Sequence, residues 1–138
     1  MSLTTRNKLE QGRAAKAYRY AEEGAKLSKK KEYKSYVKKM PMMIKVNGLG
    51  AAVAFAFSKG SKDGRPDRNN PWGLIYAQLD EWIGKEKQLM SFDQKSFANA
   101  LTELDSAQYR AVTNEVLALL NWMRRFADGL IEGESEDS

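Results

Sequence analysis

The sequence predicts an all-α protein, a compact bundle of five or six helices that forms a single domain over residues 1–131. Apolar residues recur at spacings of three and four along most of the chain, which is typical of amphipathic α-helices. No sustained alternation of apolar and polar residues indicates a half-buried strand. A length of 138 residues is enough for one hydrophobic core but not for two.

The first helix is expected to start after Thr4 or Thr5, either of which could cap it, and to run towards Leu27 or Ser28. Its apolar half consists mainly of alanine, which buries little area, so the helix must depend on docking against its neighbours. A narrow stripe of basic residues lies on the other half: Lys8, Arg19, Lys26 and Lys30.

A second, lysine-rich helix is expected over residues 29–40. Tyr33, Tyr36, Val37 and Met40 follow the spacing of one helical face, so we interpret the tyrosines as core anchors, although one could stack on a base. The polar face would carry six lysines: Lys29, Lys30, Lys31, Lys34, Lys38 and Lys39.

Pro41 is expected to end this helix and to begin another, because its missing N–H costs nothing at a first helical position. Residues 42–57 are apolar on nearly every side, which predicts either the central buried helix or a helix shared with a partner. Gly48 and Gly50 resemble the start of a dinucleotide-binding motif, but no strand precedes them, so we interpret them as sites of close helix packing.

Residues 58–70 are polar and rich in glycine, and they predict a mobile loop. Asn69 or Asn70 would cap the next helix, with Pro71 in its first turn and Gly84 at its end. The core stripe of this helix would be Leu74, Ile75, Leu79, Trp82 and Ile83.

A short helix is expected around Phe97 and Leu101, followed by a final helix from Ser106 to about Leu130 that Asp105 caps. Residues 132–138 are predicted to be a disordered acidic tail. The broad apolar face of the final helix would consist of Val112, Val116, Leu119, Leu120, Met123 and Phe126.

The composition excludes several classes of chemistry. The chain has no cysteine and no histidine, so thiolate metal sites and serine–histidine or cysteine–histidine nucleophiles are absent. The adjacent acids Glu22 and Glu23, and Asp80 and Glu81, point to different sides of their helices and cannot converge on a metal ion unaided. We therefore expect no enzyme, no cofactor and no metal, with a carboxylate-only nuclease as the remaining catalytic alternative.

Charge is distributed unevenly along the chain. The first 45 residues hold 13 of the 23 Lys and Arg residues and four acids, a net charge of +9, whereas the remaining 93 carry −4. A clustered positive surface favours the binding of a polyanion. Nucleic acid is the default candidate, because counterions are released when lysines and arginines neutralise its phosphates, and this release favours binding. The alternative is a solvated lysine-rich helix that binds nothing.

The polar side of the final helix carries a row of arginines and asparagines, including Arg110 and Asn121, that suits contacts with a nucleic-acid backbone or a partner. Alternatively, Arg124 and Arg125 interact with the helix dipole and pair with Glu115 or Asp128. Leu117 interrupts this polar side and hints at a protein contact.

Two blocks of the sequence resemble motifs of a known family. Residues 33–41 (YKSYVKKMP), 47–50 (NGLG) and 54–55 (AF) resemble the central motif of the small subunit of type III-B CRISPR effector (Cmr) complexes, and residues 109–113 (YRAVT) and 119–127 (LLNWMRRFA) resemble its C-terminal motif. Met40 stands where leucine is expected, the loop at 58–70 differs, and the acidic tail has no counterpart with a known role.

The resemblance implies a non-catalytic α-helical subunit of a ribonucleoprotein that acts in antiviral defence. Copies of such subunits stack beside the larger backbone subunits and line the channel that holds guide RNA paired to target RNA. Arg13, near the buried edge of its helix, is expected to serve folding instead. The resemblance nominates seven residues for contacts with the RNA backbone: Arg19, Lys26, Lys38, Lys39, Lys45, Arg124 and Arg125.

Two other functions stay open on the sequence alone, a free-standing helical DNA-binding regulator and a protein-only scaffold with incidental charge. The polar N-terminus is unlike a signal peptide, and the longest uncharged apolar run, residues 46–58, is too short to span a bilayer. We therefore expect a cytoplasmic protein without a membrane partner.

Overall fold

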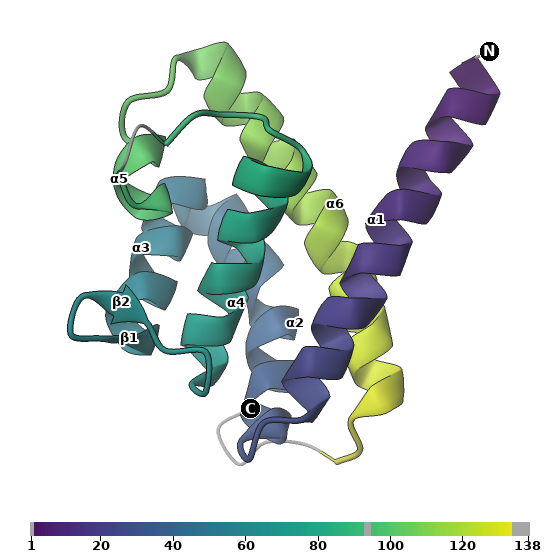
Figure 1. Cartoon of the computed structure of the whole chain (residues 1–138), viewed down its shortest axis with the longest axis vertical. Helices are drawn as coiled ribbons and strands as arrows, with labels where there is room; N and C mark the ends of the chain where they lie inside the picture. Colours follow the sequence, from purple (N-terminus) through teal and green to yellow (C-terminus); the bar gives the residue numbers. More distant parts are fainter. Residues whose placement is uncertain (1, 93–94, 134–138) are drawn as a thin grey trace.

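Two long helices, α1 (Ser2–Ala25) and α6 (Ser106–Leu130), lie side by side, and the N-terminal turns of α1 extend away from the other helices (Figure 1). The structure is a computed structural model that describes residues 2–92 and 95–133, apart from the side chains at positions 2–4 and 6. The other helices of this part are α2 (Lys30–Asn47), α3 (Leu49–Gly60), α4 (Pro71–Asp80), the π-helix η1 (Glu81–Glu86) and α5 (Phe97–Leu101). The predicted all-α fold is confirmed.

Helix α4 is the central element of the bundle. All nine residues from Pro71 to Leu79 are buried, and α4 packs against α3 and α2. We expected residues 42–57 to take this place, but Met42, Val46 and Phe55 are exposed. That prediction of a central helix is wrong; the alternative, a segment shared with a partner, stays open.

Helix α2 continues through Pro41, contrary to the predicted break at this residue. Val37, Met40 and Ile44 are all buried on one face that spans the proline, so packing compensates for the missing backbone hydrogen bond. Helix α2 ends before Gly48, whose φ is 92°. Glycine adopts this conformation readily, whereas other residues would be strained in it. The start of α3 is tied to α6 by Gly50, whose N–H donates to the Tyr109 hydroxyl at 2.7 Å.

The close approach of α1 to α2 depends on Gly24. A Cβ atom at this position would lie 2.1 Å from the Tyr33 ring. Tyr33 is fully buried, and its hydroxyl lies 2.8 Å from Gln78 Oε1 in α4, as predicted for a core anchor. Burial holds the pKa of Tyr33 above its ordinary value, so the phenol stays neutral.

The caps of the later helices follow the prediction. The Asn70 side chain accepts from Trp72 N–H and Gly73 N–H, and Asp105 accepts from Gln108 N–H at 2.8 Å. Two boundaries differ: α1 begins at Ser2, so Thr4 and Thr5 lie within it, and the fourth helix continues past Gly84 as the π-helix η1.

Residues 58–70 contain regular secondary structure that the sequence did not predict. Helix α3 extends to Gly60, and a two-stranded antiparallel hairpin, β1 (Ser61–Lys62) and β2 (Arg65–Pro66), follows it. The sequence pattern shows no strand here because each strand is only two residues long. In the predicted tail, residues 134–138 lie outside the described residues, whereas Ile131 before it is buried.

Candidate nucleic-acid interface

A groove between α2 and α6 brings together three of the seven nominated residues. We call it the α2–α6 groove, and it is lined by Lys38, Pro41, Met42, Lys45, Leu117, Ala118, Asn121 and Arg124. Lys38 and Lys45 come from α2, and Arg124 from α6, so helix packing places cations separated by up to 86 positions in one depression. No acidic side chain of the described residues lines it.

Polar groups at the edges of the groove hold its cations. Arg124 Nη2 donates to Asn121 Oδ1 at 3.1 Å, and Lys38 Nζ lies 3.9 Å from Asp128 Oδ1. The Lys38 side chain stays 43% exposed, so this long ion pair leaves its ammonium accessible to a phosphate. The pairing of Arg124 and Arg125 with Glu115 or Asp128 that we considered from the sequence is not seen among the described residues, where Glu115 pairs with Arg13 and Asp128 faces Lys34 and Lys38.

Lys34, one turn before Lys38, has a different role. It is only 8% exposed, and its Nζ donates to the carbonyl oxygens of Ile131 at 2.9 Å and Gly133 at 3.0 Å. These carbonyls follow the end of α6, where a cation is favoured by the helix dipole. Lys34 therefore fastens α2 to the end of α6, and it does not belong to the exposed basic face that the sequence predicted.

Lys39 lines a second hollow, on a different side of α2 from Lys38. We call it the aromatic hollow, and it is lined by Lys29, Glu32, Tyr36, Lys39, Met43, Phe55, Lys59, Asn70, Pro71 and Trp72. The Tyr36 and Trp72 rings stack with centroids 4.5 Å apart, and Phe55 meets Trp72 edge to face at 5.2 Å. The sequence indicated Tyr36 and Lys39 here and placed Phe55 in the family motif without a role, but it gave no sign of Lys59 or Trp72, which helix packing brings in.

Arg19 lines a third hollow, between α1 and η1, together with Lys8, Lys16 and Lys87. Lys16 Nζ lies 3.4 Å from Glu81 Oε1, so part of this positive charge is neutralised. Lys26 and Arg125 are exposed and line none of the three hollows. The seven nominated residues thus divide among several surfaces, and the α2–α6 groove collects more of them than the other two hollows.

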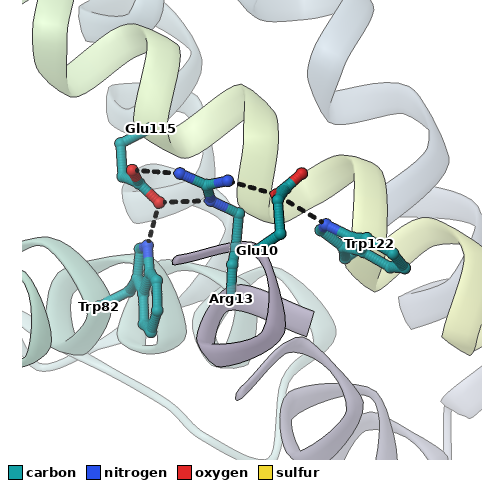
Figure 2. Close-up of polar contacts among 5 residues, drawn as sticks. All are labelled: Glu10, Arg13, Trp82, Glu115 and Trp122. Atoms are coloured by element: carbon teal, nitrogen blue, oxygen red, sulfur yellow. Dashed lines mark hydrogen bonds and ion pairs between the residues drawn. The ribbon is translucent and has the colours of Figure 1, made fainter. Parts of the chain in front are cut away.

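Arg13 forms the centre of a half-buried polar cluster that joins α1, α6 and η1 (Figure 2). Its guanidinium donates to both oxygens of Glu115 at 2.9 Å and to Glu10 Oε1, and Trp82 Nε1 donates to Glu115 at 2.8 Å. The Arg13 side chain is 16% exposed and that of Glu115 is 10% exposed. The predicted folding role of Arg13 fits this geometry; its partner Glu115, 102 positions away in the chain, left no signal in the sequence.

The electrostatics of this cluster stabilise both charges. Burial by itself raises the pKa of Glu115, but the hydrogen bonds from Arg13 and Trp82 and the nearby positive charges outweigh it and lower the pKa. The hydrogen bond with Glu115 holds the pKa of Arg13 above its ordinary value, against the effect of burial. The ion pair is therefore charged at neutral pH and ties α1 to α6.

The other acids of the described residues lie apart from one another or in small groups. Among the described residues, no group of three or more acidic side chains could hold a metal ion. Glu81 accepts from the Tyr20 hydroxyl at 2.6 Å, and this bond lowers the pKa of Glu81.

Among the helices of residues 2–92 and 95–133, none combines the length and the apolar character that a membrane span requires.

Comparison with known proteins identifies the family. The model of the family described as CRISPR-associated protein (Cas_Cmr5) matches residues 9–130. The chain is 34% identical over 119 residues to the "CRISPR system Cmr subunit Cmr5" of Thermus thermophilus, covering 86% of this chain and 92% of the relative. The crystal structure of a CRISPR-associated Cmr5 family protein, also from Thermus thermophilus, matches with a TM-score of 0.67 and 31% identity, over 89% of this chain and 96% of that chain. The chain therefore belongs to the CRISPR-associated Cmr5 family.

Proposed function

We propose that the protein is a non-catalytic small subunit of a type III-B CRISPR Cmr ribonucleoprotein complex in the cytoplasm, where it contributes to antiviral defence. Family membership and the relative named as a Cmr subunit support the assignment to this complex. In the complex it would contact larger backbone subunits and neighbouring copies of itself. Its task would be to help build the filament and to hold guide RNA paired to target RNA.

The observation that carries the RNA-holding role is the α2–α6 groove. Lys38, Lys45 and Arg124 line one depression without an acidic side chain among its described lining residues. Cations in this arrangement neutralise phosphates along a backbone, and they bind without reading bases. Base pairing between guide and target already supplies the sequence specificity that this surface lacks. One subunit covers few phosphates, so its own affinity would be low, and stacked copies would gain from multivalency.

The absence of catalysis is part of the proposal. A subunit that holds RNA needs neither a nucleophile nor a metal, and the chain contains neither cysteine nor histidine. Purified protein should therefore leave a guide–target RNA duplex intact in the presence of magnesium or manganese ions. Divalent-ion-dependent cleavage that co-purifies with the protein and is lost on mutation of its acids would contradict this part.

The assembly is tested by gentle affinity purification of the tagged protein from its native cell, with RNA sequencing and protein mass spectrometry on one eluate. We expect repeat-derived guide RNAs together with larger Cmr subunits. The triple variant Lys38→Glu, Lys45→Glu and Arg124→Glu should recover less RNA than the wild-type protein. Recovery of DNA or unrelated RNA without Cmr subunits would overturn the proposal and favour a free-standing regulator.

A further inference from the structure

The aromatic hollow combines flat rings with positive charge on a surface that the proposed backbone contacts do not use. Tyr36 and Trp72 stack with an interplanar angle of 9°, and Phe55 stands against Trp72 at 89°. Phe55 is 38% exposed, although exposing a large apolar side chain to water is unfavourable. An exposed ring that neighbouring rings hold in place is suited to receive another flat group.

Lysines surround these rings. Lys59 Nζ lies 5.7 Å from the centre of the Phe55 ring, and Lys39 Nζ lies 5.8 Å from that of Tyr36. Lys29 also lines the hollow, whereas Glu32 is the acidic residue among its described lining. Three cations against one carboxylate favour an anionic ligand, and the long lysine stems let the ammonium groups move from a ring to a phosphate.

Flat rings and the lysine side chains beside them together match one chemical class. A nucleotide in a single strand offers an aromatic base to a ring and phosphates to the lysines on either side, and such stacking tolerates every base. A paired base cannot enter, because both of its faces are covered by its neighbours in the duplex. The α2–α6 groove lacks aromatic side chains among its described lining residues, so the two surfaces should differ in the form of RNA that they prefer.

We propose that the aromatic hollow binds an unpaired nucleotide of RNA, with its base stacked on Phe55 and its phosphates held by Lys59 and Lys39. This inference rests on the proposed function and adds a second, single-strand-specific contact to it. Helix α2 then separates two RNA-contacting surfaces, with Lys38 turned to one and Lys39 to the other.

The test compares the full-length protein with Phe55→Leu, which keeps an apolar side chain but removes the flat ring. A short RNA of about twelve nucleotides, within the usual site size for such surfaces, is used as a single strand and as a perfect duplex, each at several salt concentrations. We expect the Phe55→Leu change to weaken single-strand binding by about ten-fold, with an unchanged salt slope and unchanged duplex affinity. Lys59→Gln should instead lower the single-strand salt slope by about one unit.

Tyr18→Leu is the matched control, because Tyr18 is 41% exposed and lies against Phe126, outside the hollow. Equal losses for Phe55→Leu and Tyr18→Leu, or equal losses on duplex and single strand, would overturn the inference and leave the proposed function standing. Loss of Cmr subunits from the purified complex without loss of RNA affinity would overturn it too and identify a protein interface. If the wild-type protein binds neither RNA at low salt, the inference and the RNA-holding role fail together. If Phe55→Leu does not fold, Lys59→Gln still tests the inference, and an unchanged single-strand salt slope for this variant would overturn it.

Discussion

The Arg13–Glu115 cluster and the α2–α6 groove both place charged side chains on α6, yet they serve different purposes. In the cluster an arginine and a glutamate meet at 2.9 Å with side chains 16% and 10% exposed. In the groove Lys38 is 43% exposed and reaches its nearest carboxylate at 3.9 Å. Burial and close pairing make a charge structural, whereas exposure and weak pairing leave it available to a ligand.

The largest expected effect comes from breaking the half-buried Arg13–Glu115 pair. Replacing Glu115 with alanine removes the acceptor of Trp82 Nε1 and two of the hydrogen bonds of Arg13, which keeps only Glu10, and should lower the free energy of unfolding by about 3 kcal/mol. Urea denaturation followed by circular dichroism measures this loss. The control is Glu103→Ala, which removes an exposed partner of Lys95 and should cost less than about 1 kcal/mol. Equal losses for the two variants would refute the distinction between the half-buried pair and an exposed pair.

A second effect separates two lysines that are one turn apart. Lys34→Met leaves the carbonyl groups of Ile131 and Gly133 without their donor and should destabilise the fold by about 2 kcal/mol. Lys38→Met should change stability by less than about 0.5 kcal/mol and should weaken RNA binding instead. Thermal unfolding and RNA titration of both variants decide the matter, and a reversal of these roles would contradict the assignment of Lys34 to the end of α6.

The half-buried acids also predict a pH dependence. The pKa values of Glu115 and Glu81 are lower in the folded protein than in the unfolded chain, so both stabilise the fold above the unfolded value of about 4.3 and lose this contribution as the pH falls below it. Asp80, whose pKa burial raises, acts in the opposite direction. Glu115→Gln should be less stable than wild type at about pH 7, and the difference should shrink towards about pH 3. Melting curves that stay parallel across this range would show that Glu115 does not contribute through its charge.

The smallest expected effect distinguishes two neighbouring arginines. Arg124 lines the α2–α6 groove and Arg125 does not. Arg124→Gln should therefore lower the salt slope of RNA binding by about one unit, and Arg125→Gln by less. Fluorescence anisotropy with a labelled RNA measures both slopes. A larger change for Arg125 would move the binding surface away from the groove.

The sequence predicted well those features of the fold that depend on residues close together in the chain. The bounds of α6 and the caps at Asn70 and Asp105 depend on residues within a turn or two, so they could be read from local spacing. The continuation of α2 through Pro41 depends instead on buried side chains on both sides of the proline. The contrast between Lys34 and Lys38 likewise depends on carbonyl groups 97 and 99 positions from Lys34, and no local pattern records such contacts.

The same distinction between local and long-range information applies to the candidate site. Charge clustering and the family resemblance indicated the lysines of α2 and the arginines of α6, but only packing shows that Lys38, Lys45 and Arg124 share a groove while Lys39 faces aromatic rings. Phe55 belongs to a segment expected to be buried, and Trp72 lies in the first turn of an expected helix, outside its expected core stripe. Their place near Tyr36 arises from the contacts of α3 and α4 with α2.

The most direct test of the central claim is the salt dependence of binding to a guide–target RNA duplex. Wild-type protein is compared with the triple variant Lys38→Gln, Lys45→Gln and Arg124→Gln, and the slope of log affinity against log salt is measured for two unrelated sequences. We predict that the slope falls by about three units and that both sequences lose affinity equally, because each lost phosphate contact removes about one unit. An unchanged slope, or a loss confined to one sequence, would contradict backbone binding by the α2–α6 groove.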